Sequence, residues 1–349
     1  MSELQANRII VILGSGRSGT SLLMQVLASM NMSVSENLIS ANLSNPEGLF
    51  EDVDIVEIHK KLLRQLNTHP YLPLPEGWMN TDAVQEAKSN LNQVLKQRVD
   101  SSFNIWGFKD PRTNAFLPLW FRLFNPLKIT PIFILTVRHP EATIASFLKQ
   151  YNEPMYMSEI AWLTRNIDAL HHTGADCFIV HYEDWFTRPK ELAQELLLYT
   201  GLDNYFSKDL DSILPKIVKP NLNRSISDDS RIQNPYIMKL YDHLKNCRSD
   251  KFDRNKLISV VQECHQAMDG FKVWYLIAQE KMASISNLRQ ELKSAKQQQK
   301  QIPQLEKRIE ELERENQRLS EMEKEIQRSE EVLNHITEIY LQNSSQETL

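Results

Sequence analysis

The sequence predicts an α/β fold: a P-loop-like central parallel β-sheet flanked by helices, with a C-terminal helical coiled-coil extension. Two observations predict the sheet. Short apolar runs alternate with amphipathic helical patterns, and the first run, residues 9–13, is continuous and β-branched, as in strands buried on both faces. The extension is predicted because no glycine follows Gly270 and Glu, Lys, Arg and Gln dominate after about residue 275. We therefore expect a domain over 1–275 and a helical extension over 276–349.

The elements follow one another in a strand–helix alternation. After the first strand, apolar residues recur at helical spacing from Leu22 to Met30 and predict the first helix. A later helical pattern stops at Gly174, a residue type that commonly ends helices. The further strands are predicted over 104–108, 131–137 and 176–182, and the further helices over 54–66, 81–99, 140–150, 158–173 and 189–200.

A glycine-rich turn joins the first strand to the first helix. Residues 14–19 hold three of the nine glycines, and Thr20 and Ser21 open the helix. A strand, a tight turn and a helix N-terminus aim free backbone N–H groups and the positive end of the helix dipole at one point. The turn therefore predicts an anion site for phosphate or sulfate, although a tight turn with a surface arginine is the plainer alternative.

Two known phosphate loops nearly fit this turn. The spacing from Gly14 to Gly19 is that of a Walker loop, yet Thr20 stands at the position of the phosphate-binding lysine. The dinucleotide fingerprint also fits, but residues 32–46 are polar and predict no second strand. What remains is a loop that carries its cation inside it, at Arg17, where a guanidinium suits a phosphate-like group.

Two further strands end in cations. Arg138 follows one of them, with Ser146 eight residues later on the next predicted helix, and Lys109 follows another, within Lys109-Asp110-Pro111-Arg112. Ligands of open α/β sheets bind outside the carboxyl ends of the strands, so these cations and Arg17 favour a polyanionic ligand. Taken singly, each of them is more simply a surface or ion-paired residue.

The extension carries a heptad pattern. Asparagine at one core position is frequent where a coiled coil fixes its register. Glu323 and Glu330 weaken the core, and Pro303 separates this helix from an earlier one. We expect a coiled coil that forms a homodimer or docks on a partner; the alternative is a single solvated helix folded back on the domain. The core positions are Leu305, Ile309, Leu312, Asn316, Leu319 and Ile326.

Composition limits the class of protein. The net charge of −5 gives no general attraction to nucleic acid or to anionic membranes. The three cysteines have neither metal-ligand nor disulfide spacing, which suggests reduced thiols in a cytosol. No run approaches the length of a membrane span, and residues 1–8 lack the apolar core of a signal peptide. We expect a cytoplasmic protein without a membrane span and without a nucleic-acid partner.

These motifs, in this order, resemble the sulfotransferases that use 3′-phosphoadenosine 5′-phosphosulfate (PAPS), in particular the bacterial branch related to carbohydrate sulfotransferases. The resemblance covers roughly residues 8–224 and implies PAPS as the sulfuryl donor. It assigns Arg138 and Ser146 to the 3′-phosphate, and Lys109 to a cation beside the transferring group. No metal is needed, because these cations take its place. The turn resembles the 5′-phosphosulfate cradle: Ser15, Gly16, Arg17, Ser18, Gly19, Thr20 and Ser21.

The resemblance assigns two more residues to the nucleotide. Tyr182 ends a strand where the family has a tyrosine near the adenine, and Arg224 lies in a late basic segment that closes over the nucleotide. Each also has a plain alternative, a half-buried tyrosine at the sheet edge and a solvated loop.

Sulfuryl transfer needs in-line positioning, cations on the charged oxygens and a general base. Arg17 and Lys109 suit the second task. The family uses His or Glu as the base, and a similar Asn-Pro-x-Gly-x-x-Glu stretch in bacterial relatives points to Glu51, with Glu47 in reserve. A carboxylate at the N-terminus of the next helix is the equally simple role for Glu51.

The acceptor is expected to be a hydroxyl of a carbohydrate or glycolipid, by family analogy. An aromatic loop with Tyr71 and Trp78 is a candidate for stacking on a sugar ring. The sequence leaves two alternatives open. One is a P-loop nucleotide kinase or NTPase with a degenerate loop, and the other is an inactive nucleotide-binding coiled-coil scaffold.

Overall fold

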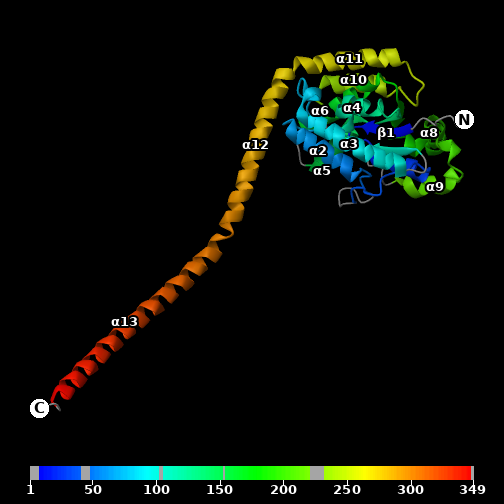
Figure 1. Cartoon of the computed structure of the whole chain (residues 1–349). Helices are drawn as coiled ribbons and strands as arrows, with labels where there is room; N and C mark the ends of the chain where they lie inside the picture. Colours follow the sequence, from blue (N-terminus) through cyan, green and yellow to red (C-terminus); the bar gives the residue numbers. More distant parts are fainter. Residues whose placement is uncertain (1–7, 41–47, 102–104, 152–153, 221–231, 347–349) are drawn as a thin grey trace. The chain divides into compact units, whose positions relative to one another are not determined.

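The computed structural model describes residues 8–40, 48–101, 105–151, 154–220 and 232–346. Internal contacts divide the chain into two compact units, Met1–Ala283 and Ser284–Leu349. The larger unit holds a four-stranded parallel sheet in the order β2-β1-β3-β4, and Figure 1 shows its strands enclosed by helices. The strands are β1 (Arg8–Gly14), β2 (Trp106–Lys109), β3 (Thr130–Val137) and β4 (Phe178–His181).

Helices of the larger unit connect and cover the strands. They are α1 (Thr20–Ser29), α2 (Val53–Gln65), η1 (Trp78–Asn80), α3 (Asp82–Ser101), α4 (Thr113–Phe124), α5 (Pro140–Tyr151), α6 (Met155–Thr173), α7 (Asp184–Thr187), α8 (Pro189–Thr200), η2 (Leu202–Asn204), α9 (Leu210–Ile217), α10 (Pro235–Leu244) and α11 (Arg254–Gly270). Two long helices follow, α12 (Lys272–Gln299) and α13 (Ile302–Gln346).

Alternation along β1 explains the two faces of the sheet. Ile9, Val11 and Leu13 point into one apolar core, which α2, α3, α4, α6, α10 and α11 complete. Ile10 and Ile12 point into a second core, which α1, α8 and α9 complete. Because successive side chains of a strand face opposite sides, an apolar residue at every position predicts helices on both faces. The parallel α/β sheet predicted from the sequence is confirmed.

Two glycines end helices, and the first of them, Gly174, is the stop that the sequence predicted. Gly174 ends α6 with φ 62°, and Gly201 ends α8 with φ 76°, both in the left-handed region that favours glycine. The predicted helix over 158–173 begins earlier, at Met155, directly after Pro154. The α-helices that were not predicted from the sequence are α4, α7, α9, α10 and α11.

Lys300 and Gln301 separate α12 from α13, so the break predicted beside Pro303 lies between these two helices. Pro303 sits in the first turn of α13, where its missing N–H would have no intrahelical partner in any case. The described part of the chain contains no helix that is both long and apolar enough to cross a membrane.

Candidate functional site

The carboxyl ends of three adjacent strands place the predicted cations at one edge of the sheet. β1 runs into the glycine-rich turn, and its neighbours β2 and β3 end at Lys109 and just before Arg138. In the register of the sheet, Lys109 pairs with Ile12 and Thr136 pairs with Gly14. The topology therefore brings Arg17, Lys109 and Arg138 to the same edge, as the sequence predicted.

The glycine-rich turn is shaped by close contacts that exclude side chains. Gly14 has φ 134°, and a Cβ there would lie 2.5 Å from the backbone oxygen of Thr136. Gly19 has φ 94°, and a Cβ there would lie 2.2 Å from the ring of Tyr182. Both glycines are required by space as well as by backbone conformation. Asn114 braces the turn by accepting from Gly14 N at 3.3 Å and donating to Gly14 O at 2.9 Å.

Gly19 is also the N-cap of α1, and no side chain caps this end of the helix. The first N–H groups of a helix have no intrahelical partner, so those of Thr20 and Ser21 remain available to a ligand. The Ser15 hydroxyl oxygen is fully buried and has no hydrogen-bond partner among the described residues. Ser18 is engaged within the turn, donating to Ser15 O at 2.6 Å. An orphan hydroxyl beside free amides fits an anionic group with several oxygens.

Arg17 and Arg138 lie against each other across the turn. Arg17 Nε donates to Ser146 Oγ at 3.0 Å, and Arg138 Nη1 donates to the backbone oxygen of Arg17 at 3.3 Å. The guanidinium carbon of Arg138 stands 4.5 Å from the centre of the Tyr182 ring. Sequence reasoning grouped Ser146 with Arg138; the structure shows Ser146 bonded to Arg17. Gly16, in the same turn, faces the ring of Phe147, which a Cβ would approach to 3.1 Å.

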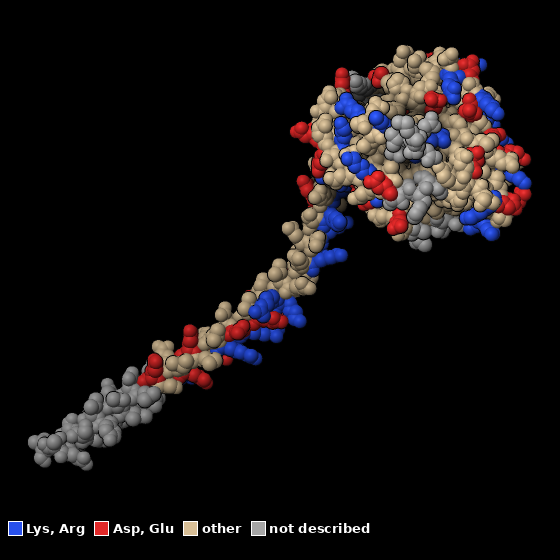
Figure 2. All heavy atoms as spheres, turned by 45° about the vertical axis from the view of Figure 1, so that its right-hand side comes forward, with Lys and Arg blue, Asp and Glu red and all other residues tan. Residues whose placement is uncertain are grey.

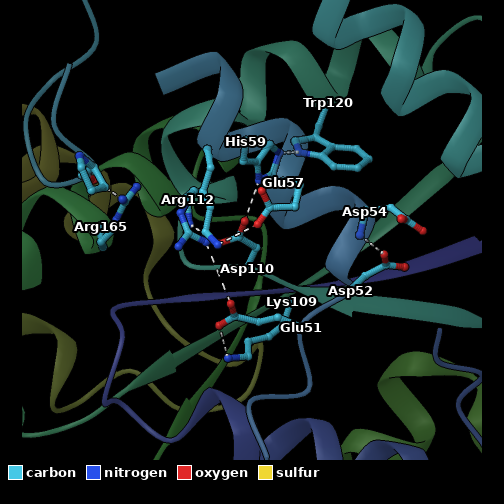
Figure 3. A network of polar contacts seen from close by, with 12 residues as sticks. Glu51, Asp52, Asp54, Glu57, His59, Lys109, Asp110, Arg112, Trp120 and Arg165 are labelled. Carbon is cyan, nitrogen blue, oxygen red and sulfur yellow. Dashed lines mark hydrogen bonds and ion pairs between the residues drawn. The ribbon is translucent and has the colours of Figure 1, made fainter. Parts of the chain in front are cut away.

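Glu51 and Lys109 form a buried ion pair. Lys109 Nζ donates to Glu51 Oε1 at 2.7 Å, and Arg112 Nη1 lies 3.9 Å from Glu51 Oε2 (Figure 3). The N-cap of α2 is Asp52, not Glu51, since the Asp52 side chain accepts from Asp54 N at 3.0 Å. The helix-capping role considered for Glu51 therefore belongs to its neighbour.

Two contacts hold the segment that carries Glu51. Arg98 of α3 pairs with Asp52 through Nε at 2.8 Å. Ser21 of α1 donates to the backbone oxygen of Leu49 at 3.1 Å, which ties this segment to the first turn after the glycines. Glu51 is thus fixed both to the sheet edge and to the predicted phosphate loop.

A buried chain of polar contacts supports Arg112, and sequence reasoning did not find it (Figure 3). Arg112 Nη1 donates to Asp110 Oδ1 at 2.7 Å, and His59 Nδ1 lies 2.8 Å from Asp110 Oδ2. Trp120 Nε1 donates to His59 Nε2 at 3.2 Å. An indole can only donate, so His59 Nε2 accepts and Nδ1 carries the proton that is donated to Asp110. His59 lies on the apolar face of α2, so the helical pattern of the sequence predicts only an ordinary core position there.

Neighbouring charges set the ionisation of Asp110 and Arg112 in this series of buried polar contacts. Burial alone would raise the pKa of Asp110, but Arg112 and His59 hold that pKa below its ordinary range. Burial alone would lower the pKa of Arg112, but the carboxylates of Asp110 and Glu51 raise it. Asp110 is therefore a fixed anion and Arg112 a fixed cation, and this pair presents the guanidinium to Glu51.

The aromatic loop meets the site through Phe147. The Tyr71 and Phe147 rings lie edge to face at 5.9 Å, and Phe147 covers Gly16. Trp78 instead packs against Phe116 at 5.6 Å, in the apolar core. Of the two aromatic residues considered for the acceptor, Tyr71 alone reaches the glycine-rich turn through these contacts. Arg224 and Glu47 lie outside the described residues.

No group of three or more metal-ligating side chains was found among the described residues. On the face of the domain seen in Figure 2, acidic and basic side chains are interspersed, in keeping with the small net charge of −5. Any strong attraction for an anion must therefore come from local groups such as those described above.

Comparison with known proteins identifies the family. A family model described as the sulfotransferase family matches residues 9–207. Curated protein sequences gave no match. Among solved structures, the chain is similar to the sulfotransferase domain of an olefin synthase from Synechococcus PCC 7002, with 20% identity, TM-score 0.35, and 75% and 96% of the two chains covered.

Two further structures are similar to this chain. One is the sulfotransferase domain from the curacin biosynthetic pathway, with 18% identity, TM-score 0.38, and 75% of this chain and 97% of that chain covered. The other is a sulfotransferase from Mycobacterium avium, with 13% identity, TM-score 0.35, and 65% of this chain and 79% of that chain covered.

Proposed function

Because the chain belongs to the sulfotransferase family, whose model spans residues 9–207, we propose that it transfers the sulfuryl group of PAPS to a hydroxyl of a carbohydrate or glycolipid. The observation that carries the proposal is the meeting of Arg17, Lys109 and Arg138 with Glu51 at one sheet edge, around a turn with free helix amides. A donor with a phosphosulfate and a second phosphate needs such a concentration of cations.

The residues of the turn suit the phosphosulfate end of the donor. Several dipoles here point their positive ends at one place and need no reorganisation when a ligand binds. They are the amides of Thr20 and Ser21, the hydroxyl of Ser15 and the dipole of α1. Ser146 holds the Arg17 guanidinium in place at 3.0 Å. We assign Arg17 to the charge that grows on the bridging oxygen as the donor loses its sulfuryl group.

Arg138 suits the second phosphate of the donor, and Tyr182 suits its adenine. The guanidinium is stacked on the Tyr182 ring and bonded to the backbone of Arg17, so its position is set before any ligand arrives. Tyr182 in turn covers Gly19, which links the nucleotide end of the site to the phosphate loop.

Glu51 is assigned as the general base. The acceptor oxygen forms a bond to sulfur, its proton passes to Glu51, and the bond from sulfur to the 5′-phosphate oxygen breaks, leaving 3′-phosphoadenosine 5′-phosphate. From its place on Glu51, Lys109 also supports negative charge on the sulfuryl oxygens. Arg112, fixed by Asp110, keeps the second oxygen of Glu51 oriented.

Thermal denaturation with four ligands tests the donor. A ligand that binds only the folded state raises the melting temperature, so 3′-phosphoadenosine 5′-phosphate should raise it, whereas AMP, NAD and ATP with Mg²⁺ should raise it much less. A preference for ATP with Mg²⁺ would favour the nucleotide kinase or NTPase instead. Binding of the bisphosphate without turnover on any of a panel of carbohydrate and glycolipid acceptors would favour the inactive scaffold.

The catalytic unit is proposed to lie within 1–275, with 276–349 as a separate helical extension, in a protein of the cytoplasm. A chain that ends at Ala283, the limit of the larger compact unit, tests the division. It should melt cooperatively and keep the response to 3′-phosphoadenosine 5′-phosphate. Loss of that response in a folded truncated chain would place part of the site in the extension.

A further inference from the structure

Helix α13 carries an uncovered apolar seam on one side. Its apolar side chains alternate every three and four residues, and their exposed fractions run from 46% at Leu312 to 60% at Leu305. These positions fit a and d of a heptad repeat, with isoleucine at a and leucine at d in the first turns. The seam consists of Ile302, Leu305, Ile309, Leu312, Asn316, Leu319 and Ile326.

The rest of the helix is polar. From Gln304 to Arg328, every b, c and f position of this repeat holds Gln, Lys, Arg or Glu, and the only apolar residue outside a and d is Met322. A helix that packs on a globular domain needs a wider apolar stripe, at least about 100° across, whereas a strict a/d seam is the narrower contact of a coiled coil. The occupant of the seam is therefore another helix with the same narrow pattern.

From these observations we propose that α13 pairs with α13 of a second copy of this chain in a parallel, two-stranded coiled coil. Isoleucine at a together with leucine at d favours two strands. Asn316 at an a position meets its own copy in a parallel dimer, where the two amides hydrogen-bond and fix the register. In an antiparallel pair it would face an apolar d residue and lose that partner.

Charges beside the seam are compatible with a parallel pair. There, g residues face e residues of the next heptad, which sets Arg308 against Glu313 of the second copy. In an antiparallel pair, e faces e and g faces g, which can set Arg308 against Glu315, so these charges do not select the orientation and Asn316 does. Arg308 already pairs within its own helix with Glu311 at 3.1 Å, so the gain from any such partner is modest.

A substitution at Glu323 tests the proposal, because it should strengthen the dimer. It occupies an a position, so a parallel dimer brings two carboxylates together in the seam. Glu323→Ile should tighten the dimer at least about tenfold, because it replaces like charges with an apolar pair. An isolated helix has no reason to respond in this way. The inference rests on the pattern of α13 and is independent of the proposed function.

Sedimentation equilibrium of the full chain measures the association. The parent protein should approach twice 40.7 kDa as its concentration rises. Leu312→Glu with Leu319→Glu should weaken the dimer at least about 100-fold. Gln304→Glu with Gln317→Glu adds the same charge on the outer face and should leave it unchanged. The proposal would be overturned if the parent protein were a monomer at every concentration or a trimer. It would also be overturned if both double variants weakened the dimer equally.

Oxidative cross-linking tests the orientation. Ile309→Cys, at an a position that meets its own copy in a parallel pair, should give a disulfide-linked dimer when oxidised glutathione accepts the two electrons and protons of the thiols, whereas Gln317→Cys, at an outer position, should not. The native Cys177, Cys247 and Cys264 are buried, and both variants contain them, so any cross-linking through them is the same in both. Equal cross-linking of the two variants, or none in a sample shown to be dimeric, would rule out the parallel pair.

Discussion

Lys109 Nζ donates a 2.7 Å hydrogen bond to Glu51 Oε1, and both side chains are buried. The pair joins the last residue of β2 to the residue just before the cap of α2, across 58 positions of sequence. A buried charge is stable only with a partner, so each side chain fixes the other. The segment that carries this carboxylate is tied to the helix that follows the glycine-rich turn, because Ser21 donates to Leu49 O.

Glu51→Gln should lower turnover by about 10²–10⁴-fold, because a general base contributes about that factor. The affinity for 3′-phosphoadenosine 5′-phosphate should change little. Glu57→Gln, on the exposed face of α2, is the matched control. Steady-state kinetics and calorimetric titration provide the two readouts, and retained turnover would remove Glu51 from the mechanism.

Lys109→Met should destabilise the domain by about 3–5 kcal/mol, since it leaves the Glu51 carboxylate buried without its nearest cation. Lys109→Met combined with Glu51→Gln should recover part of that loss and remain inactive. Urea denaturation measures the free energy of unfolding. If the single and the double variant are equally unstable, Lys109 and Glu51 are not coupled in their contributions to the free energy of unfolding.

Arg138→Met should abolish the preference for a 3′-phosphate. The parent protein is expected to bind 3′-phosphoadenosine 5′-phosphate more tightly than AMP, and the variant should bind the two nearly alike, because the guanidinium charge is missing. Lys96→Met, at an exposed position of α3, should keep the preference. An unchanged ratio of dissociation constants in Arg138→Met would place the second phosphate elsewhere.

Gly19→Ala should destabilise the domain by more than the backbone cost alone, which is about 1–3 kcal/mol for a side chain with positive φ. The added methyl group also meets the Tyr182 ring at 2.2 Å. Gly77→Ala is the control, since Gly77 has φ 71° and open space around its Cβ position. Similar losses in the two variants would show that the Tyr182 ring moves aside freely.

Acid should weaken the contact between α6 and α11. Burial, together with His171 and His265, lowers the pKa of His172 to about 4. Because the unfolded chain binds a proton near pH 6.5 and the folded chain does not, stability falls as the pH drops from about 6.5 to 4. His172→Asn should therefore reduce this slope in urea titrations at several pH values. Identical slopes would contradict the effect.

The local features around the glycine-rich turn were predictable because they depend on neighbours in sequence. The apolar run of β1, the glycines after it and the helical spacing from Leu22 lie within one strand–turn–helix unit. Helix α4 was missed because it is mostly buried and carries Pro118, a residue type that usually interrupts a helix.

By itself, the sequence determined the α/β class, the glycine-rich turn with Arg17 and the narrow seam of α13, because each depends on residues that are close along the chain. Only the tertiary structure decided that Ser146 holds Arg17, that Asp52 rather than Glu51 caps α2, and that His59 and Asp110 stand behind Arg112. These contacts depend on the order of the strands and on how α2 packs against α3 and α4, which side-chain spacing within one segment does not specify.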